Sequence, residues 1–93
     1  MSIEHIIKRD FTKVEYDITK IAAAIFKAMT ARGRGTEEDA KVVAERVNYV
    51  LLERKQKDVE FTPTVEQIQD IVEEQLMESH FPEVAKAYIL YRN

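Results

Sequence analysis

The stretch IIKRDFTKVEYDITKIAAAI, residues 6–25, contains the two features that decide the fold. Residues 3–9 and 14–16 are short apolar segments on either side of a polar break, which is typical of a β-hairpin. Asp17 then has the character of a helix N-cap, because its carboxylate can accept hydrogen bonds from the free N–H groups of a first turn. The stretch therefore predicts a hairpin that leads directly into a helix.

Four segments after Asp17 carry apolar residues at helical spacing. Their stripes are Ile18, Ile21, Ala22, Ile25, Ala28 and Met29; Ala40, Val43, Ala44, Val47 and Leu51; Val65, Ile68, Ile71, Val72 and Leu76; and Val84, Ala87, Tyr88 and Tyr91. The glycines of RGRG, residues 32–35, end the first helix, and Thr36 and Thr64 open the next two with capping-box spacing. Pro82 suits the first turn of the fourth. Residues 59–61 predict a short additional strand.

These elements predict an α+β, mainly α domain. We expect one domain over residues 1–93, with a β cap at 1–17 above a bundle of four helices at 18–93. Short connections between the helices favour antiparallel neighbours.

Composition narrows the class of protein. The chain has 93 residues, a formal net charge of -3 and no cysteine, which excludes disulfides, thiol nucleophiles and cysteine zinc sites. Its longest apolar run, residues 21–26, is too short to span a bilayer, so no membrane partner is expected. The charged N-terminus does not resemble a secretory signal, and a cytoplasmic protein is expected.

Charge is distributed unevenly along the chain. Residues 1–34 contain seven Lys and Arg against four Asp and Glu, a net of +3, whereas residues 35–93 contain seven against thirteen, a net of -6. The imbalance indicates an anionic ligand near the N-terminal third. The acidic remainder argues against nucleic acid as a partner.

Lys8, Arg9 and Lys20 form a candidate phosphate site. A helix N-terminus attracts anions, a lysine beside it adds a point charge, and an arginine adds a bidentate fork. The hairpin and the start of the helix could thus form a pocket for a polyphosphate. The alternative is that these are surface cations paired with Asp10, Glu15 and Asp17.

No catalytic residues are predicted. His5 and His80 are the two histidines and have no paired acids at a recognisable spacing, and no phosphate loop, nucleophile elbow or HExxH motif is present. Acidic runs at residues 37–39 and 73–74 are interpreted as solvated helix segments, so no metal site is assigned to side chains. Tyr88 and Tyr91 fit either core packing or a platform for stacking a base.

Several segments together resemble the ATP-cone domain. They are IIKRD, VEYDITKI and AIFKA near the start, VEQIQDIVEEQLM at residues 65–77, and AKAYILYR at residues 85–92. The resemblance covers nearly all of the chain in order. One departure is Phe11, which stands where the family's hairpin usually has glycine; because phenylalanine at positive φ is costly, we expect the turn to take another shape.

The resemblance implies a regulatory domain that binds ATP and dATP, excised from a ribonucleotide reductase subunit. Such domains control activity through nucleotide-dependent oligomerisation, so other subunits or cones of the reductase and self-association are implied as partners. An active site of its own is not implied. The alternatives are a helical protein–protein interaction module that no longer binds nucleotide, a small nucleic-acid-binding domain, and an enzyme.

The resemblance also assigns roles to individual residues. Phosphates would be held by Lys8, Arg9 and Lys20, and Mg²⁺ would accompany them. Asp17 would hydrogen-bond the adenine edge. The apolar walls would be Ile6, Val14 and Ile21, and the residues that approach the nucleotide from the third helix and the tail would be Thr62, Glu66, Tyr91 and Arg92.

Overall fold

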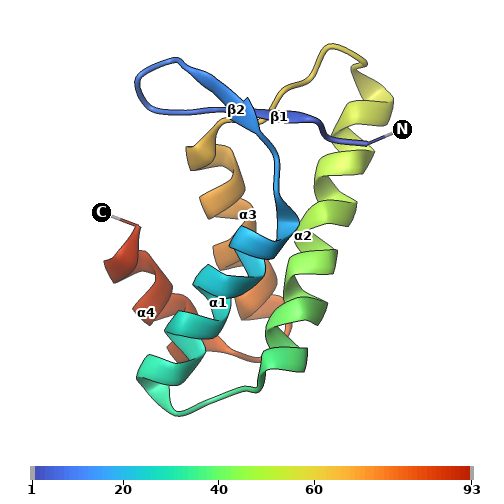
Figure 1. Ribbon diagram of the computed structural model, residues 1–93. Helices are drawn as coiled ribbons and strands as arrows, with labels where there is room; N and C mark the ends of the chain where they lie inside the picture. The colour runs from blue at the N-terminus through green and yellow to red at the C-terminus, as the bar shows by residue number, and fades with distance from the viewer. Residues whose placement is uncertain (1, 93) are drawn as a thin grey trace.

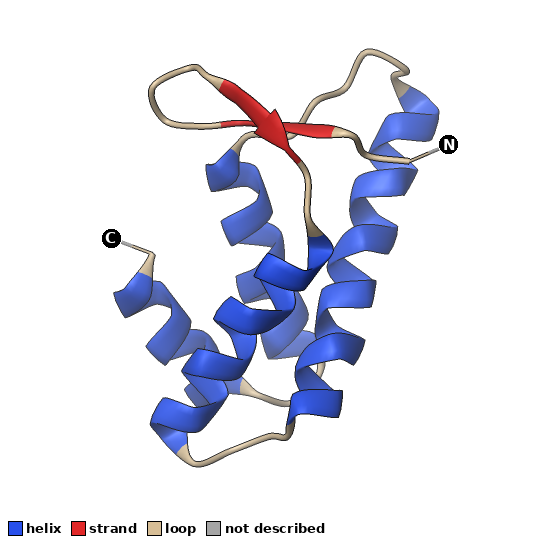
Figure 2. Cartoon of the chain, viewed as in Figure 1, coloured by secondary structure: helices blue, strands red, loops and turns tan. Residues whose placement is uncertain are grey.

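A computed structural model of the protein describes residues 2–92, apart from the side chain of Tyr91. A two-stranded antiparallel hairpin comes first, and four helices follow in this described part (Figures 1 and 2). The elements are β1 (His5–Ile7), β2 (Lys13–Glu15), α1 (Ile18–Arg32), α2 (Glu37–Lys57), α3 (Val65–Glu78) and α4 (Pro82–Tyr91). The predicted fold class is confirmed.

The helices form a closed ring in which α1 packs against α2 and α4, and α3 packs against the same two helices. Most of their predicted stripe residues fill the centre, and every stripe residue of α2 is buried. In α1, by contrast, only Ile25, Ala28 and Met29 are buried, and the stripe residues nearer its start are half-buried. Of these, Ile21 lines a cavity next to the hairpin, whereas Ile18 and Ala22 line a groove between α1 and α2.

The predicted helix ends form by local hydrogen bonds. Asp17 accepts from the backbone N–H of Thr19 at 2.9 Å, and capping boxes close the starts of α2 and α3. Gly33 ends α1 in the left-handed conformation at φ 63°, where a glycine is favoured. The predicted strand at residues 59–61 is wrong. Asp58 instead accepts from Glu60 N and Phe61 N, so the chain turns back before it can pair with a neighbour.

Several contacts attach the hairpin and its flanking residues to the rest of the domain. Ile7 N donates to Pro63 O at 2.9 Å, the Tyr16 hydroxyl donates to Asn48 Oδ1 of α2 at 2.8 Å, and Ile3 is buried in the core. A two-stranded ribbon alone is marginally stable in water. These contacts therefore hold the hairpin across the ends of the helices, as Figure 1 shows.

The hairpin turn has a residue in the left-handed conformation at position 11, although the phenylalanine there was expected to prevent it. Phe11 has φ 67°, and it donates to Lys8 O while Lys8 N donates to Thr12 O, the pattern of a turn closed by a bulge. The expectation of another turn shape is therefore wrong. Asp10 explains the result, because its Oδ1 accepts from the N–H and hydroxyl of Thr12 at 3.1 and 2.6 Å and stabilises this path.

Replacing Phe11 by glycine should stabilise the protein. The Phe11 side chain is 89% exposed, so its removal loses little burial, while the left-handed strain disappears. After the greater flexibility of glycine in the unfolded chain is subtracted, we expect a gain of about 0.5–1 kcal/mol in the free energy of unfolding. Urea denaturation measures it. Lys13→Gly, at an unstrained position in β2, should instead destabilise, and an equal response of the two variants would contradict the prediction.

Across residues 2–92, none of the helices combines the length and the apolar character needed to cross a membrane.

Candidate functional site

A cavity of about 430 Å³ lies where the hairpin meets α1, α3 and α4; we call it the cap cavity. Its volume is within the range of roughly 300–1,000 Å³ that is typical of small-molecule sites. The residues that line it are Ile6, Lys8, Val14, Glu15, Tyr16, Asp17, Lys20, Ile21, Ala24, Val65, Ile68, Gln69 and Tyr88.

A second hollow of about 380 Å³ shares Lys8, Val65 and Gln69 with the cap cavity, and we call it the rim hollow. Its remaining residues are Arg9, Asp10 and Arg92. Three cations and one carboxylate therefore line it, and two of the cations, Arg9 and Arg92, also have carboxylate partners on α3. The shared residues connect the cap cavity with an opening that carries guanidinium and ammonium groups, an arrangement that suits a ligand with an apolar body and an anionic end.

Six of the predicted site residues come together in the cap cavity: Ile6, Lys8, Val14, Asp17, Lys20 and Ile21. Arg9 and Arg92 line the rim hollow instead, and Glu66 forms an ion pair with Arg9 at 3.5 Å. Thr62 lines neither hollow. Tyr91 belongs to α4, but its side chain lies outside the described part of the structure.

Lys8 and Lys20 are available for an anionic ligand. Within residues 2–92, no carboxylate lies within 4.0 Å of either ammonium group. Both lysines nevertheless interact with nearby carboxylates over a longer distance, since, after the larger effect of hydrogen bonds from neighbouring threonines, Lys8 lowers the pKa of Asp10 and Lys20 lowers the pKa of Asp17. Arg9 differs, since its carboxylate partner is Glu66 of α3. Two lysines that form no salt bridge thus line one cavity, from the hairpin turn and from the first turn of α1.

Asp17 can cap helix α1 with one carboxylate oxygen and contact a ligand with the other. Its Oδ1 accepts from the hydroxyl and the N–H of Thr19, at 2.6 and 2.9 Å, and the hydroxyl bond is the main cause of a pKa below the ordinary aspartate value, with Lys20 adding a smaller effect. The carboxylate is therefore ionised at neutral pH. Both bonds go to Oδ1, so Oδ2 has no partner among the described residues and can accept from a donor in the cavity.

An arginine network closes the rim. Arg92 donates to Gln69 Oε1 at 3.1 Å and Asp70 Oδ1 at 2.9 Å, and it also contacts the Glu73 carboxylate. The bond to Asp70 is the largest cause of an Arg92 pKa above the ordinary value, so this side chain stays charged at every working pH. Arg9 joins the network through Gln69 Oε1 at 3.3 Å.

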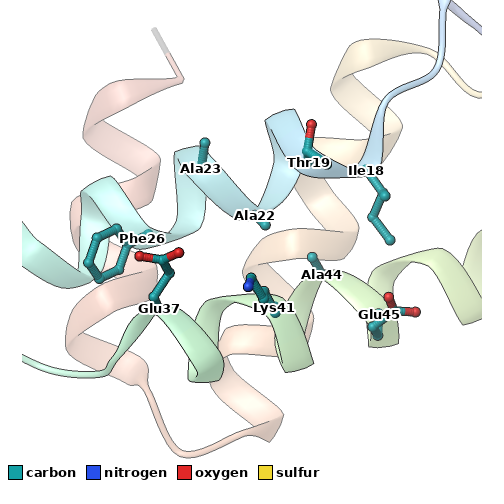
Figure 3. A pocket seen from close by; sticks show the side chains of 9 residues that line it. All are labelled: Ile18, Thr19, Ala22, Ala23, Phe26, Glu37, Lys41, Ala44 and Glu45. Carbon is teal, nitrogen blue, oxygen red and sulfur yellow. The ribbon is translucent and has the colours of Figure 1, made fainter.

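A larger groove, about 510 Å³, lies on the outside of the bundle between α1 and α2 (Figure 3). Apolar side chains of α1, including Ala22 and Phe26, face α2 across it. Its one lysine, Lys41, is paired with Glu38 at 3.7 Å, and Glu37 and Glu45 add negative charge. This groove would repel a phosphate, so the smaller cap cavity is the better anion site.

Residues 4–93 match the ATP cone domain family. The chain belongs to the ATP-cone family. The resemblance drawn from KRD, VEYDITKI and the tail is therefore confirmed, and the hairpin over four helices is the architecture that the resemblance implied.

The curated relatives of this ATP-cone are reductases. It is 42% identical over 95 residues to a vitamin B12-dependent ribonucleoside-diphosphate reductase of Thermoplasma acidophilum, covering 97% of this chain and 12% of that protein. It is 39% identical over 93 residues to an anaerobic ribonucleoside-triphosphate reductase of Haemophilus influenzae, covering all of this chain and 13% of that protein. It is 38% identical over 96 residues to the ribonucleoside-diphosphate reductase subunit alpha of Chlamydia pneumoniae, covering 98% of this chain and 9% of that protein. The chain thus spans only about an eighth or less of their length.

Seven residues that line the ATP-cone's cavity were not assigned to it from the sequence: Glu15, Tyr16, Ala24, Val65, Ile68, Gln69 and Tyr88. Gln69 lies one helical turn beyond Val65 on the same face of α3, and that spacing was the pattern that could have indicated it. Tyr88, interpreted from sequence as core or base-stacking, is 8% exposed and also lines the cavity. The sequence places it on the inner face of α4 but does not say what that face covers.

Burial of two tyrosines should make the ATP-cone sensitive to alkali. Burial raises the pKa of Tyr16 and of Tyr88 to about 12, with Glu45 and Glu73 as smaller causes, and Arg92 partly opposes the change at Tyr88. Between pH 10 and pH 12 the unfolded tyrosines ionise while the folded ones stay neutral, so stability is lost as pH rises. We expect a loss of roughly 2–3 kcal/mol, less than two full shifts because Tyr16 is only half-buried.

The measurement is urea denaturation at a series of pH values. Tyr88→Phe should flatten the decline between pH 10 and 12, because one of the two titrating groups is gone while lysine titration is common to both proteins. An unchanged slope in the variant would contradict the assignment.

Proposed function

We propose that this ATP-cone is an allosteric regulatory domain of a ribonucleotide reductase that binds ATP and dATP. The observation that carries the proposal is the cap cavity, which is lined by six predicted nucleotide-binding residues, among them Lys8 and Lys20, neither of which forms a salt bridge within the described residues. The similarity to reductases supports the proposal that the domain regulates a ribonucleotide reductase.

The apolar part of the cavity suits the adenine ring. Ile6, Val14 and Ile21 supply flat apolar contact from the hairpin and from α1. The Oδ2 atom of Asp17 can accept from the exocyclic amino group of adenine, a donor that guanine lacks at that position. This contact would favour adenine over guanine, because an unpaired polar group at the wrong base costs about 1–3 kcal/mol.

The phosphates are expected at the boundary between the cap cavity and the rim hollow. Lys8 lines both, and Lys20 lines the cavity beside it. Mg²⁺ would enter with the nucleotide, held by phosphate oxygens; in the described part of the chain no three His, Asp or Glu residues are grouped so that they could hold a metal. The ion would neutralise part of the phosphate charge.

Regulation would follow from differential binding. A nucleotide shifts the equilibrium between two assemblies only by the difference in its affinity for them, commonly about 1–3 kcal/mol. ATP and dATP differ by one 2′-hydroxyl, so we infer that they stabilise different arrangements of the hairpin and bundle surface, and that dATP promotes self-association. The domain would regulate the reductase without catalysing a reaction itself.

Isothermal titration with ATP, dATP and GTP in the presence of Mg²⁺ tests the proposal. Saturable binding of both adenine nucleotides and weaker binding of GTP are expected. At one hundred times the dissociation constant, ligand should add about 2.7 kcal/mol to the free energy of unfolding. No heat and no thermal shift at millimolar nucleotide would overturn the proposal. Self-association that is indifferent to dATP, measured by sedimentation, would instead favour an interaction module that no longer binds nucleotide.

A further inference from the structure

Arg9 connects the hairpin turn with the far end of the chain. Its Nη2 donates to the backbone carbonyl of Arg92 at 2.9 Å and to Gln69 Oε1 at 3.3 Å, and its Nε lies 3.5 Å from the Glu66 carboxylate. The first of these contacts joins residues 83 positions apart in the sequence. We call this set of contacts the Arg9 latch.

The latch caps the C-terminal end of α4. The last carbonyls of a helix have no partner within it, and the helix dipole makes that end negative. The last turn of α4 contains no basic residue of its own, and Arg92 is its C-cap. Arg9 therefore supplies from the hairpin a hydrogen-bond donor for the Arg92 carbonyl, together with a positive charge, while the side chain of Arg92 itself is bound to α3.

Gln69 links the latch to the cap cavity. Its Oε1 accepts from Arg9 and from Arg92, and because a guanidinium only donates, the oxygen must face the two arginines. The amide nitrogen of Gln69 has no hydrogen-bond partner among the described residues. Since Gln69 lines both the cavity and the rim hollow, this nitrogen can donate to a ligand there.

We propose that a bound polyphosphate takes Arg9 from the carbonyl of Arg92, so that nucleotide binding in the cap cavity releases the C-terminal end of α4. This inference rests on the proposed function and adds the structural change that nucleotide binding would cause at the end of α4. A guanidinium bonds more strongly to a charged phosphate than to a neutral carbonyl. The competing ion pair with Glu66 is more than half exposed on both sides and therefore weak.

The release stays local, because Arg92 has a second attachment. Its side chain keeps Asp70 and Glu73 of α3 as partners whichever acceptor Arg9 selects. Helix α4 thus remains docked on the bundle, and the change is confined to its last turn. A segment that continues the chain beyond α4 would experience nucleotide binding as the loss of this cap.

Nuclear magnetic resonance of the whole chain tests the latch with MgATP as the probe. In the wild type, MgATP should move the Arg92 carbonyl ¹³C signal upfield and raise exchange of the Arg92 amide, which bonds to Tyr88 O, roughly five-fold, the equivalent of one lost hydrogen bond. Arg9→Ala should show the upfield Arg92 carbonyl shift and the faster Arg92 amide exchange before any ligand is added, and MgATP should change neither of them further.

The control is Arg54→Ala, which removes an exposed cation of α2 and should behave as the wild type.

The outcomes separate the two proposals. If MgATP shifts the signals of Ile6 and Ile21 but leaves Arg92 unchanged, the latch inference is overturned while the nucleotide site stands. If MgATP changes Arg92 as much in Arg9→Ala as in the wild type, the latch inference is also overturned. If no signal responds in any variant, both the proposed function and the latch fail.

Discussion

Replacing Lys8 and Lys20 together by alanine lowers the affinity for ATP and dATP by about a hundredfold or more, since each charged hydrogen bond contributes about 1.5–3 kcal/mol. Both lysines line the cap cavity, and neither forms a salt bridge within the described chain. Their loss leaves phosphate oxygens facing apolar surface and the Asp17 carboxylate. Isothermal titration measures the change.

The fold should tolerate the double substitution, because both lysines are exposed. Circular dichroism should therefore show wild-type helix content and a melting temperature close to that of the wild type without ligand. The matched control is Lys57→Ala with Lys86→Ala, which removes two exposed cations away from the cavity. An equal loss of affinity in the control would mean that net charge, rather than the site, attracts the nucleotide, and unchanged binding in Lys8→Ala, Lys20→Ala would remove the basis of the proposal.

Leu51→Ala has the largest expected effect on stability. Leu51 is fully buried on the inner face of α2, so its truncation removes apolar contact and leaves a cavity at the centre of the ring of helices. We expect a loss of about 2–5 kcal/mol in the free energy of unfolding. For a domain of this size, that corresponds to a fall of roughly 10–30 °C in melting temperature.

Leu90→Ala is the matched control for Leu51→Ala. The chemical change is the same, but Leu90 is 71% exposed, so its loss should stay within about 0.5 kcal/mol of zero. Saturating dATP should recover part of the stability lost in Leu51→Ala, because ligand that binds only the folded state adds RT ln(1 + [L]/Kd). Comparable melting temperatures for the two alanine variants would show that the core is not where the structure places it.

The local features were predictable because neighbouring residues create them. The cap at Asp17, the stop at Gly33 and the buried stripe of α2 each follow from residues within one or two helical turns. The two wrong expectations concern loops. At Phe11, Asp10 stabilises a left-handed residue that propensity disfavours, and at residues 59–61 a side chain of Asp58 favours a turn over a strand.

The cations of the site also show that residues close in sequence can be grouped correctly while their places in the structure are not predicted. Lys8, Arg9 and Lys20 were one group by spacing, but in the structure Lys8 and Lys20 line the cap cavity, whereas Arg9 lines only the adjoining rim hollow, which it shares with Lys8. Alternation along a strand could not decide this, because β1 ends at Ile7 and the turn redirects the residues that follow. Helical spacing could have placed Gln69 on the same face as Val65, but not beside Arg9 and Arg92, which come from the opposite ends of the chain.

The sequence by itself determined the order of the elements, their caps, the buried faces of the helices and the ATP-cone family, since periodicity, capping and motif are properties of adjacent residues. Only the tertiary structure decided that Lys8 and Lys20 share a cavity and that Arg9 reaches the last turn of α4. Those arrangements depend on how the hairpin docks on the bundle through Pro63 and Asn48. Contacts across 60 and 83 positions have no local energetic signature, because they exist only after the helices have packed.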